Sequence, residues 1–141
     1  MSDENDWVVT ASADHAARGK AESIVQASHG KDFALRRMKP GDGVVIYSPR
    51  TTFPDGPALQ AFTLIGRVAE GAPWQHEIGG HQMWRRRVIW QSGRIALIRP
   101  LLEDLQITRG LLSWGMAFRY GVTKLARSDY ARLAREMVEG G

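Results

Sequence analysis

Two histidines and a glutamate stand close together in the middle of the chain, at His76, Glu77 and His81. The order is close to the HExxH zinc motif, in which two histidines four residues apart lie on one face of a helix. Here the histidines are five residues apart, and Gly79 and Gly80 between them disfavour a helix. We therefore expect a loop that carries two solvated histidines and holds no metal.

Other motifs that carry catalysis or hold a cofactor are absent from the sequence. It contains no GxGxxG segment after a strand, no Walker loop and no GxSxG elbow. It has no cysteine, which excludes disulfides, thiolate zinc sites and cysteine nucleophiles. No spacing selects an acid–base pair from the 4 histidines and 15 carboxylates. We expect a chain that is not an enzyme and needs no cofactor.

Positive charge is concentrated in the second half of the chain. Residues 76–141 carry 11 Lys and Arg against 6 Asp and Glu, a net charge of +5, whereas residues 1–75 have a net charge of −1. The basic half includes the run Arg85, Arg86 and Arg87, in which strand alternation puts Arg85 and Arg87 on one face. This distribution favours an anionic partner, and a solvated basic surface explains it equally well.

The bulk composition fits a single globular domain over residues 1–141. Hydrophobic residues make up 43% of the chain and charged residues 24%, both ordinary values. The acidic start, residues 1–6, lacks the basic and apolar parts of a secretory signal. No window approaches the ~18 apolar residues of a membrane span. We expect a cytoplasmic monomer that does not enter a membrane.

The first half of the chain predicts alternating strands and helices. Residues 7–11 read as a strand, and a helix capped by Asp14 has small and apolar residues at helical spacing until Gly30. Residues 33–38 predict a helical turn. After the turn-forming Lys39-Pro40-Gly41-Asp42, the apolar residues 43–47 predict a strand buried on both faces.

The second half predicts consecutive strands and a final helix. The strands fall at residues 60–68, 83–91, 95–98 and 121–125, with loops at 48–57 and 71–80, a helical turn at 101–105, and an amphipathic helix that starts at Ser128. Consecutive strands favour antiparallel hairpins over a parallel sheet. We expect an α+β fold, a small and mostly antiparallel β-barrel, partly closed, with flanking helices.

Three segments taken in order carry a family resemblance. They are residues 28–42, which contain HGK and RMKPGD, residues 47–56, which read YSPRTTFPDG, and residues 60–68. Their order and spacing resemble the EVE-domain family, a branch of the PUA-like superfamily that also includes the YTH readers of methylated adenine. Residues 7–12 and 114–130 fit as well, so the resemblance covers almost the whole chain.

The resemblance implies a PUA-like barrel that binds nucleic acid, either RNA or modified DNA, without catalysis. It also implies a pocket that accepts a flipped or chemically modified base. The base-pocket candidates are Ser12, His29, Gly30, Lys31, Tyr47, Ser48, Pro49 and, among the five tryptophans, Trp114. The candidate phosphate contacts are Arg50, Arg85, Arg86, Arg87 and Arg119.

Structural roles compete with these assignments, and other functions compete with base binding. His29 has the position of a helix C-terminal residue, Tyr47 that of a core residue, and Ser48 and Pro49 that of turn residues. A nucleic-acid- or nucleotide-processing enzyme that uses His29 and His81 is one alternative function. A protein-interaction domain that uses its aromatic residues is the other.

Overall fold

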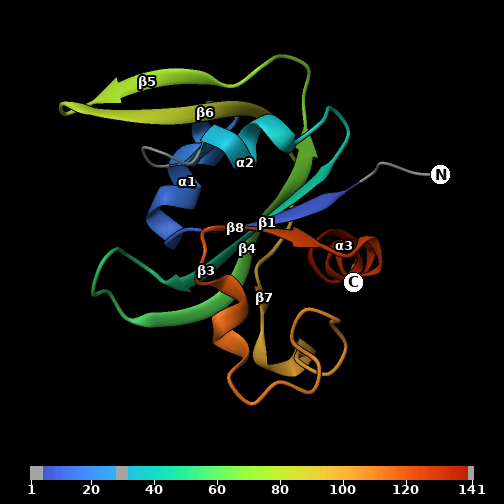
Figure 1. The fold of residues 1–141 in the computed structure, drawn as a ribbon. Coiled ribbons are helices and arrows are strands. Elements are labelled where there is room, and N and C mark those ends of the chain that lie inside the picture. The colour runs from blue at the N-terminus through green and yellow to red at the C-terminus, as the bar shows by residue number, and fades with distance from the viewer. Residues whose placement is uncertain (1–4, 28–31, 140–141) are drawn as a thin grey trace.

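Eight strands and three α-helices are formed by residues 5–27 and 32–139, the part of the chain that the computed structural model describes (Figure 1). The strands are β1 (Asp6–Thr10), β2 (Ile24–Ala27), β3 (Gly43–Arg50), β4 (Ala58–Val68), β5 (Trp74–Ile78), β6 (His81–Trp90), β7 (Ala96–Leu97) and β8 (Val122–Leu125). The helices are α1 (Ala13–Glu22), α2 (Asp32–Arg37) and α3 (Arg127–Ala134). Two 3-10 turns at Arg99–Leu101 and Trp114–Phe118 and a π-helical turn at Arg135–Glu139 complete the order.

The strands form a mixed sheet that curls into a half-barrel. Its order is β2-β6-β4-β3-β1-β8, with β5 paired to β6 and β7 paired to β4. Among the described strands only β1 and β3 pair in parallel, because the chain between them crosses over through α1, β2 and α2. The α+β class predicted from the sequence is therefore confirmed, with one parallel pair in an otherwise antiparallel sheet.

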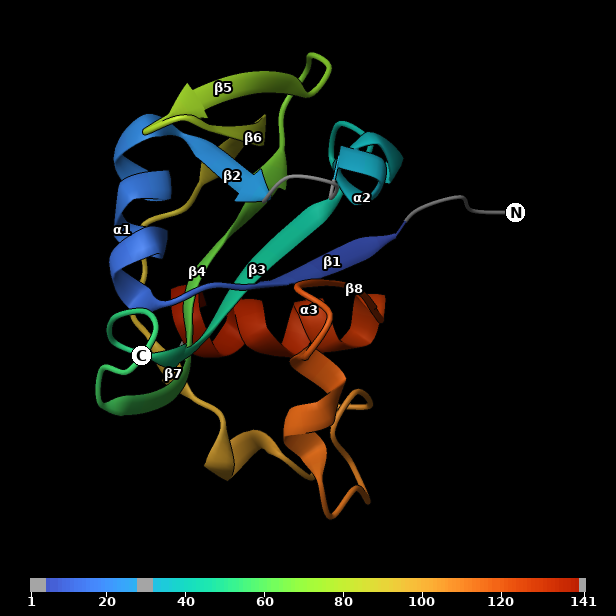
Figure 2. The ribbon, with the colours of Figure 1, turned by 60° about the vertical axis from the view of Figure 1, so that its left-hand side comes forward.

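The sheet separates two hydrophobic clusters. Strand β3 supplies both, because its side chains alternate: Val44 and Ile46 join one cluster, whereas Val45 and Tyr47 join the other. Helix α1 packs on the first side and contributes Ala16. Helix α3 and the segment between β7 and β8 pack on the second side, and Figure 2 shows them together on the face opposite α1.

The first helix is shorter than the sequence predicts. It begins after Ser12 rather than at Asp14 and ends at Glu22, where Ser23 takes a left-handed φ of 59°. The predicted helix therefore does not reach Gly30. Residues Ile24–Ala27 instead form β2, which pairs antiparallel with the Trp84–Arg87 part of β6. The β-branched Ile24 and Val25 favour a strand when β6 is available as a partner. The helical spacing of apolar residues gives no information about this pairing, because β6 is distant in the sequence.

The segment 71–80 also differs from the prediction, because it contains a strand and not only a loop. Trp74–Ile78 forms β5, which pairs with β6 as a hairpin. Gly79 and Gly80, with φ values of 55° and 82°, make the two-residue turn, since two successive positive φ angles suit glycine. The exposed His76 and His81 thus lie on a hairpin rather than on a loop.

The predicted C-terminal helix is confirmed as α3. Its Tyr130 and Leu133 are buried, and Met137 is buried in the π-helical turn that follows. The Tyr130 hydroxyl donates a hydrogen bond to the Gly66 carbonyl at 2.8 Å, which ties the helix to β4. Gly43 in β3 leaves room for this ring, since an ideal Cβ there would lie 2.4 Å from Tyr130 Cε2.

We expect Gly43→Ala to lower the free energy of unfolding by about 1–3 kcal/mol, because the methyl group overpacks the Tyr130 ring. Urea denaturation followed by circular dichroism measures the change. Gly115→Ala is the matched control, since no atom lies within 4 Å of an ideal Cβ there. Equal stabilities of the two variants would contradict the prediction.

Candidate functional site

A cavity of about 510 Å³ lies between α1 and the sheet. We call it the α1 cavity. Val9, Ile46 and Leu64 form its apolar floor, and they come from three adjacent strands. The register aligns them, because Val9 pairs with Ile46 and Ile46 pairs with Leu64. Ala16 of α1 faces this floor, so a small side chain keeps the space open.

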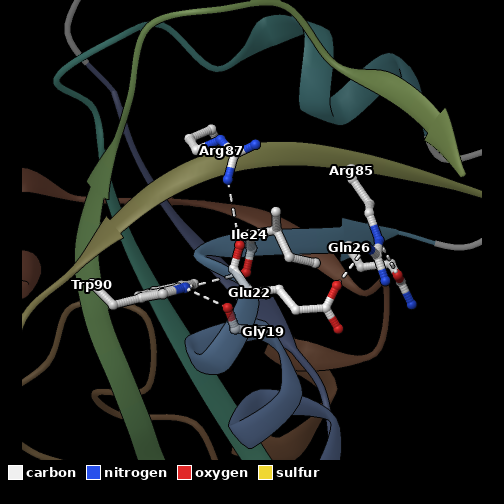
Figure 3. Close-up of polar contacts among 7 residues, drawn as sticks. All are labelled: Gly19, Glu22, Ile24, Gln26, Arg85, Arg87 and Trp90. Atoms are coloured by element: carbon white, nitrogen blue, oxygen red, sulfur yellow. Dashed lines mark hydrogen bonds and ion pairs between the residues drawn. The ribbon is translucent and has the colours of Figure 1, made fainter.

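Charged and polar groups line one wall of the α1 cavity. Arg85 of β6 donates from Nη1 to Glu22 Oε1 at 2.7 Å and from Nε to Gln26 Oε1 at 2.8 Å. Figure 3 shows how these three side chains come together from α1, β2 and β6. The Arg85 side chain is 11% exposed, whereas that of Glu22 is 47% exposed. Two bonds therefore fix the Arg85 guanidinium at the cavity wall.

Trp90 forms a rigid aromatic part of the same wall. Its indole Nε1 donates to the carbonyls of Gly19 and Ile24, both at 3.2 Å (Figure 3). These bonds join the end of α1 to β2 and hold the ring in place. Arg87, on the same face of β6 as Arg85, donates to the Glu22 carbonyl at 3.4 Å and lies over Trp74 rather than in the cavity.

An exposed aromatic residue stands at the edge of the α1 cavity. Phe53, on the loop between β3 and β4, is 72% exposed, and its ring centroid lies 6.2 Å from that of His15. The loop is attached to α1 by a hydrogen bond from the Asp14 amide to the Thr51 carbonyl at 3.0 Å. His15 and Phe53 thus offer two rings at the rim, and His81 lines the cavity from β6.

The start of α1 adds a hydroxyl and a carboxylate. Ser12 lines the cavity, is 6% exposed, and donates a hydrogen bond to Asp14 Oδ1. This bond is the main reason that the pKa of Asp14 lies below its ordinary value, with His15 and Arg18 acting in the same direction. With its proton committed to Asp14, the Ser12 hydroxyl can offer its oxygen to a ligand as an acceptor.

Of the residues predicted from the sequence to form the site, Ser12 and Arg85 line the α1 cavity. Tyr47 does not, because strand alternation points it to the opposite face from Ile46. There its ring stacks on Phe118 at 4.4 Å, and Trp114 meets it edge-on at 6.5 Å. Burial raises the pKa of Tyr47 to about 12, against a smaller opposing effect of Arg99, so it is a neutral core residue.

The remaining predicted residues are distributed around the molecule. Ser48 is fully buried and shares a 2.8 Å hydrogen bond with Thr63, and the neighbouring Pro49 continues β3. Arg50 donates to the Gly56 carbonyl at 2.8 Å and so braces its own loop. Arg119 lies over Tyr120 at 4.6 Å. His29, Gly30 and Lys31 lie outside the described residues.

The arginine run does not form one strip. Arg85 and Arg87 lie on the face of β6 that turns toward α1, as alternation predicts, whereas Arg86 is buried on the other face and donates to the Leu35 carbonyl at 3.1 Å. Among residues 5–27 and 32–139, no group of three or more His, Cys, Asp or Glu side chains is placed so that it could hold a metal ion. None of the helices formed by those residues is long and apolar enough to cross a membrane.

The fold and the cavity define a class: a small α+β half-barrel with a ligand-sized, largely apolar cavity under its first helix. A family model, the EVE domain, matches residues 5–136, and the chain belongs to the EVE-domain family. The resemblance found in the sequence is thereby confirmed.

Relatives with similar sequences agree with this assignment, and a solved structure shares the fold. A UPF0310 protein of Mycolicibacterium vanbaalenii is 44% identical over 133 residues, covering 94% of this chain and 92% of the relative. A UPF0310 protein of Renibacterium salmoninarum is 41% identical over 127 residues, covering 90% and 91%. The crystal structure of protein PSPTO5229 from Pseudomonas syringae has a TM-score of 0.55 at 11% identity and covers 92% of this chain and 97% of that one. The likeness to that structure concerns the fold alone.

Proposed function

We propose that the chain is a non-catalytic nucleic-acid-binding module that takes one flipped or modified base into the α1 cavity. The observation that carries the proposal is the cavity itself, whose 510 Å³ lies within the range of about 300–1,000 Å³ typical of ligand pockets. An apolar floor and a few polar groups on the wall suit a planar ring with hydrogen-bonding edges.

The residues around the cavity supply each of the interactions that an extruded base needs. Stacking on an aromatic ring is worth ~1–3 kcal/mol per base, and His15, Phe53 and Trp90 present rings at the rim and wall. Ser12 offers an acceptor, and Gln26 offers an amide to the base edge. The net charge of +4 supports contacts with the flanking phosphates.

Three finer expectations belong to the same proposal. A PUA-like superfamily relationship is supported by the mixed half-barrel with helices on both faces. We expect the protein to act in the cytoplasm as a monomer. The nucleic acid is either RNA or modified DNA, and separate titrations with each in the binding experiment distinguish them.

We expect fluorescence anisotropy to detect binding to labelled single-stranded RNA or DNA, plain or base-methylated, that weakens between about 50 and 200 mM salt. Arg85→Gln is expected to weaken binding about tenfold. The substitution removes the guanidinium that Arg85 presents at the cavity wall, and with it one charge-assisted hydrogen bond to the nucleic acid. Arg94→Gln is the matched control, since it makes the same change in net charge but Arg94 lies outside the cavity.

Absence of binding to every oligonucleotide at about 50 mM salt would overturn the proposal. Equal weakening by Arg85→Gln and Arg94→Gln would show that net charge alone attracts the nucleic acid and that the cavity takes no part. The non-catalytic part is checked by incubating labelled RNA and DNA with the protein, with and without added divalent metal. Any change in the substrate would contradict it.

A further inference from the structure

A second cleft, of about 550 Å³, opens beside α2 and β6. Alternation within residues 83–86 separates the two sites locally, since Met83 and Arg85 line the α1 cavity whereas Trp84 and Arg86 line this cleft, and the two linings share no residue. In Figure 2, strand β2 runs between α1 and α2, and α2 packs against β6 on the side of the second cleft. We call this site the Arg86 cleft; Arg36, Lys39, Trp84, Arg86 and residues 71–73 line it.

Arg86 is a buried cation whose hydrogen-bonding capacity is not filled. It is 5% exposed, and its Nη1 donates to the Leu35 carbonyl at 3.1 Å. Its Nε has no hydrogen-bond partner within the part of the chain that the structure describes. Burying a guanidinium without a matching anion is unfavourable, so an orphaned donor of this kind calls for an explanation.

Among the side chains that the structure describes, no carboxylate forms an ion pair with Arg86. Of the two carboxylates that attract Arg86 electrostatically, Asp42 has the larger effect. Its Oδ2, however, accepts hydrogen bonds from Trp7 Nε1 and from the Lys39 amide, both at 2.9 Å. Glu70 is exposed. Burial lowers the pKa of Arg86 below its ordinary value, and the attraction of Asp42 and Glu70 only partly opposes that effect.

Two further cations stand around the same cleft. The Arg36 guanidinium lies 5.5 Å from the centroid of the Trp84 ring, which holds the cation at the mouth of the cleft. Lys39 lines the cleft and is exposed. Three cationic side chains around one concavity match an anion with more than one oxygen and more than one negative charge, since guanidinium forks bind such groups bidentately.

We propose that the Arg86 cleft is a phosphate-binding site, in which Arg86 and Arg36 grip a phosphate group and Lys39 adds charge at the rim. The phosphate belongs either to a free phosphorylated small molecule or to the backbone of a nucleic acid. The site stands on its own geometry, because its lining residues are different from those of the α1 cavity. Its existence does not depend on base binding there.

Titration with inorganic phosphate alone tests the site without any nucleic acid. The readout is the arginine Nε–H signals in 1H–15N NMR spectra, at constant ionic strength in a buffer free of phosphate. We expect saturable shifts of the Arg86 Nε–H signal, assigned by its loss in Arg86→Lys. We expect Arg36→Gln to weaken phosphate binding about tenfold, the effect of one charge-assisted hydrogen bond.

Arg37→Gln is the matched control, because Arg37 is the next residue of α2, is also exposed, and lies over Trp7 and Phe33 instead of lining the cleft. Unchanged affinity in this variant together with weakened affinity in Arg36→Gln supports the site. A lack of saturable shifts at Arg86 would overturn it, as would equal weakening by Arg36→Gln and Arg37→Gln. If Arg86→Lys fails to fold, the comparison of Arg36→Gln with Arg37→Gln still decides.

A single-stranded oligonucleotide added to the phosphate-loaded protein identifies the source of the phosphate. Displacement of phosphate from Arg86 assigns the cleft to backbone phosphates, whereas retention assigns it to a free phosphorylated molecule. Failure of the proposed base site leaves a different signature, because Arg85→Gln then has no specific effect on anisotropy while the Arg86 signal still responds to inorganic phosphate.

Discussion

Replacing Trp7 by alanine is expected to lower the free energy of unfolding by about 3–5 kcal/mol, the usual range for a large aromatic residue removed from a core. Trp7 is 1% exposed and belongs to the cluster formed with Leu35, Met38 and Val44. Its Nε1 also donates to Asp42 Oδ2 at 2.9 Å, so the substitution removes a donor from a buried carboxylate. Urea denaturation followed by circular dichroism gives the measurement.

Trp74→Ala is the matched control for this large effect. Trp74 lies on the β5–β6 hairpin, is partly exposed, and lies under the Arg87 guanidinium. The same chemical change there is expected to alter the unfolding free energy by less than about 1 kcal/mol. Comparable losses in the two variants would show that Trp7 does not anchor the core on the α1 side of the sheet.

The hydrogen bond between Trp7 and Asp42 also joins two segments far apart in the sequence. Asp42 accepts from the Lys39 amide as well, and the Gly43 amide donates to Asp6 Oδ1 at 2.7 Å. The turn before β3 is therefore attached to β1 through buried carboxylates. The contacts of Asp42 with Trp7 and of Gly43 with Asp6 connect residues 35 and 37 positions apart and lie beyond the reach of local sequence patterns.

Elements with strong local signals could be predicted from the sequence. The apolar run that became β3, the alternation in β4 and the stripe of α3 each bury a face that the residue order itself defines. The strand β2 could not, because Ile24 and Val25 also fit the helical spacing of the preceding residues. Only β6, some 60 residues later, decides in favour of the strand.

The sequence indicates only some of the residues that line the α1 cavity, for a similar reason. Ser12 and Arg85 line it, whereas Tyr47 faces the other side of a strand whose continuous apolar run gives no indication of which face turns toward α1. Phe53 lies within the segment 47–56 that carries the family resemblance, and this position is the signal that could have indicated it. Trp90 carried no local signal that separates a cavity wall from a core position.

Filling the α1 cavity from its roof is expected to abolish base insertion while leaving the fold intact. Ala16→Leu adds apolar atoms next to the floor formed by Ile46 and Leu64 and occupies part of the 510 Å³. Leucine has nearly the helix propensity of alanine, so α1 should persist. Affinity for the oligonucleotide is expected to fall about 5- to 150-fold, the equivalent of one lost stacking interaction of ~1–3 kcal/mol.

Ala17→Leu separates this effect from a general change in the helix. Ala17 is the next residue of α1 and is exposed, so the same substitution adds the same atoms to the solvent side, and affinity should remain unchanged. The slope of log affinity against log salt adds a second readout, because it counts phosphate contacts. Ala16→Leu should lower affinity without changing that slope, since the cations stay in place. A fall in the slope would mean that the substitution disturbs the phosphate contacts, and wild-type affinity would mean that the base lies outside the cavity.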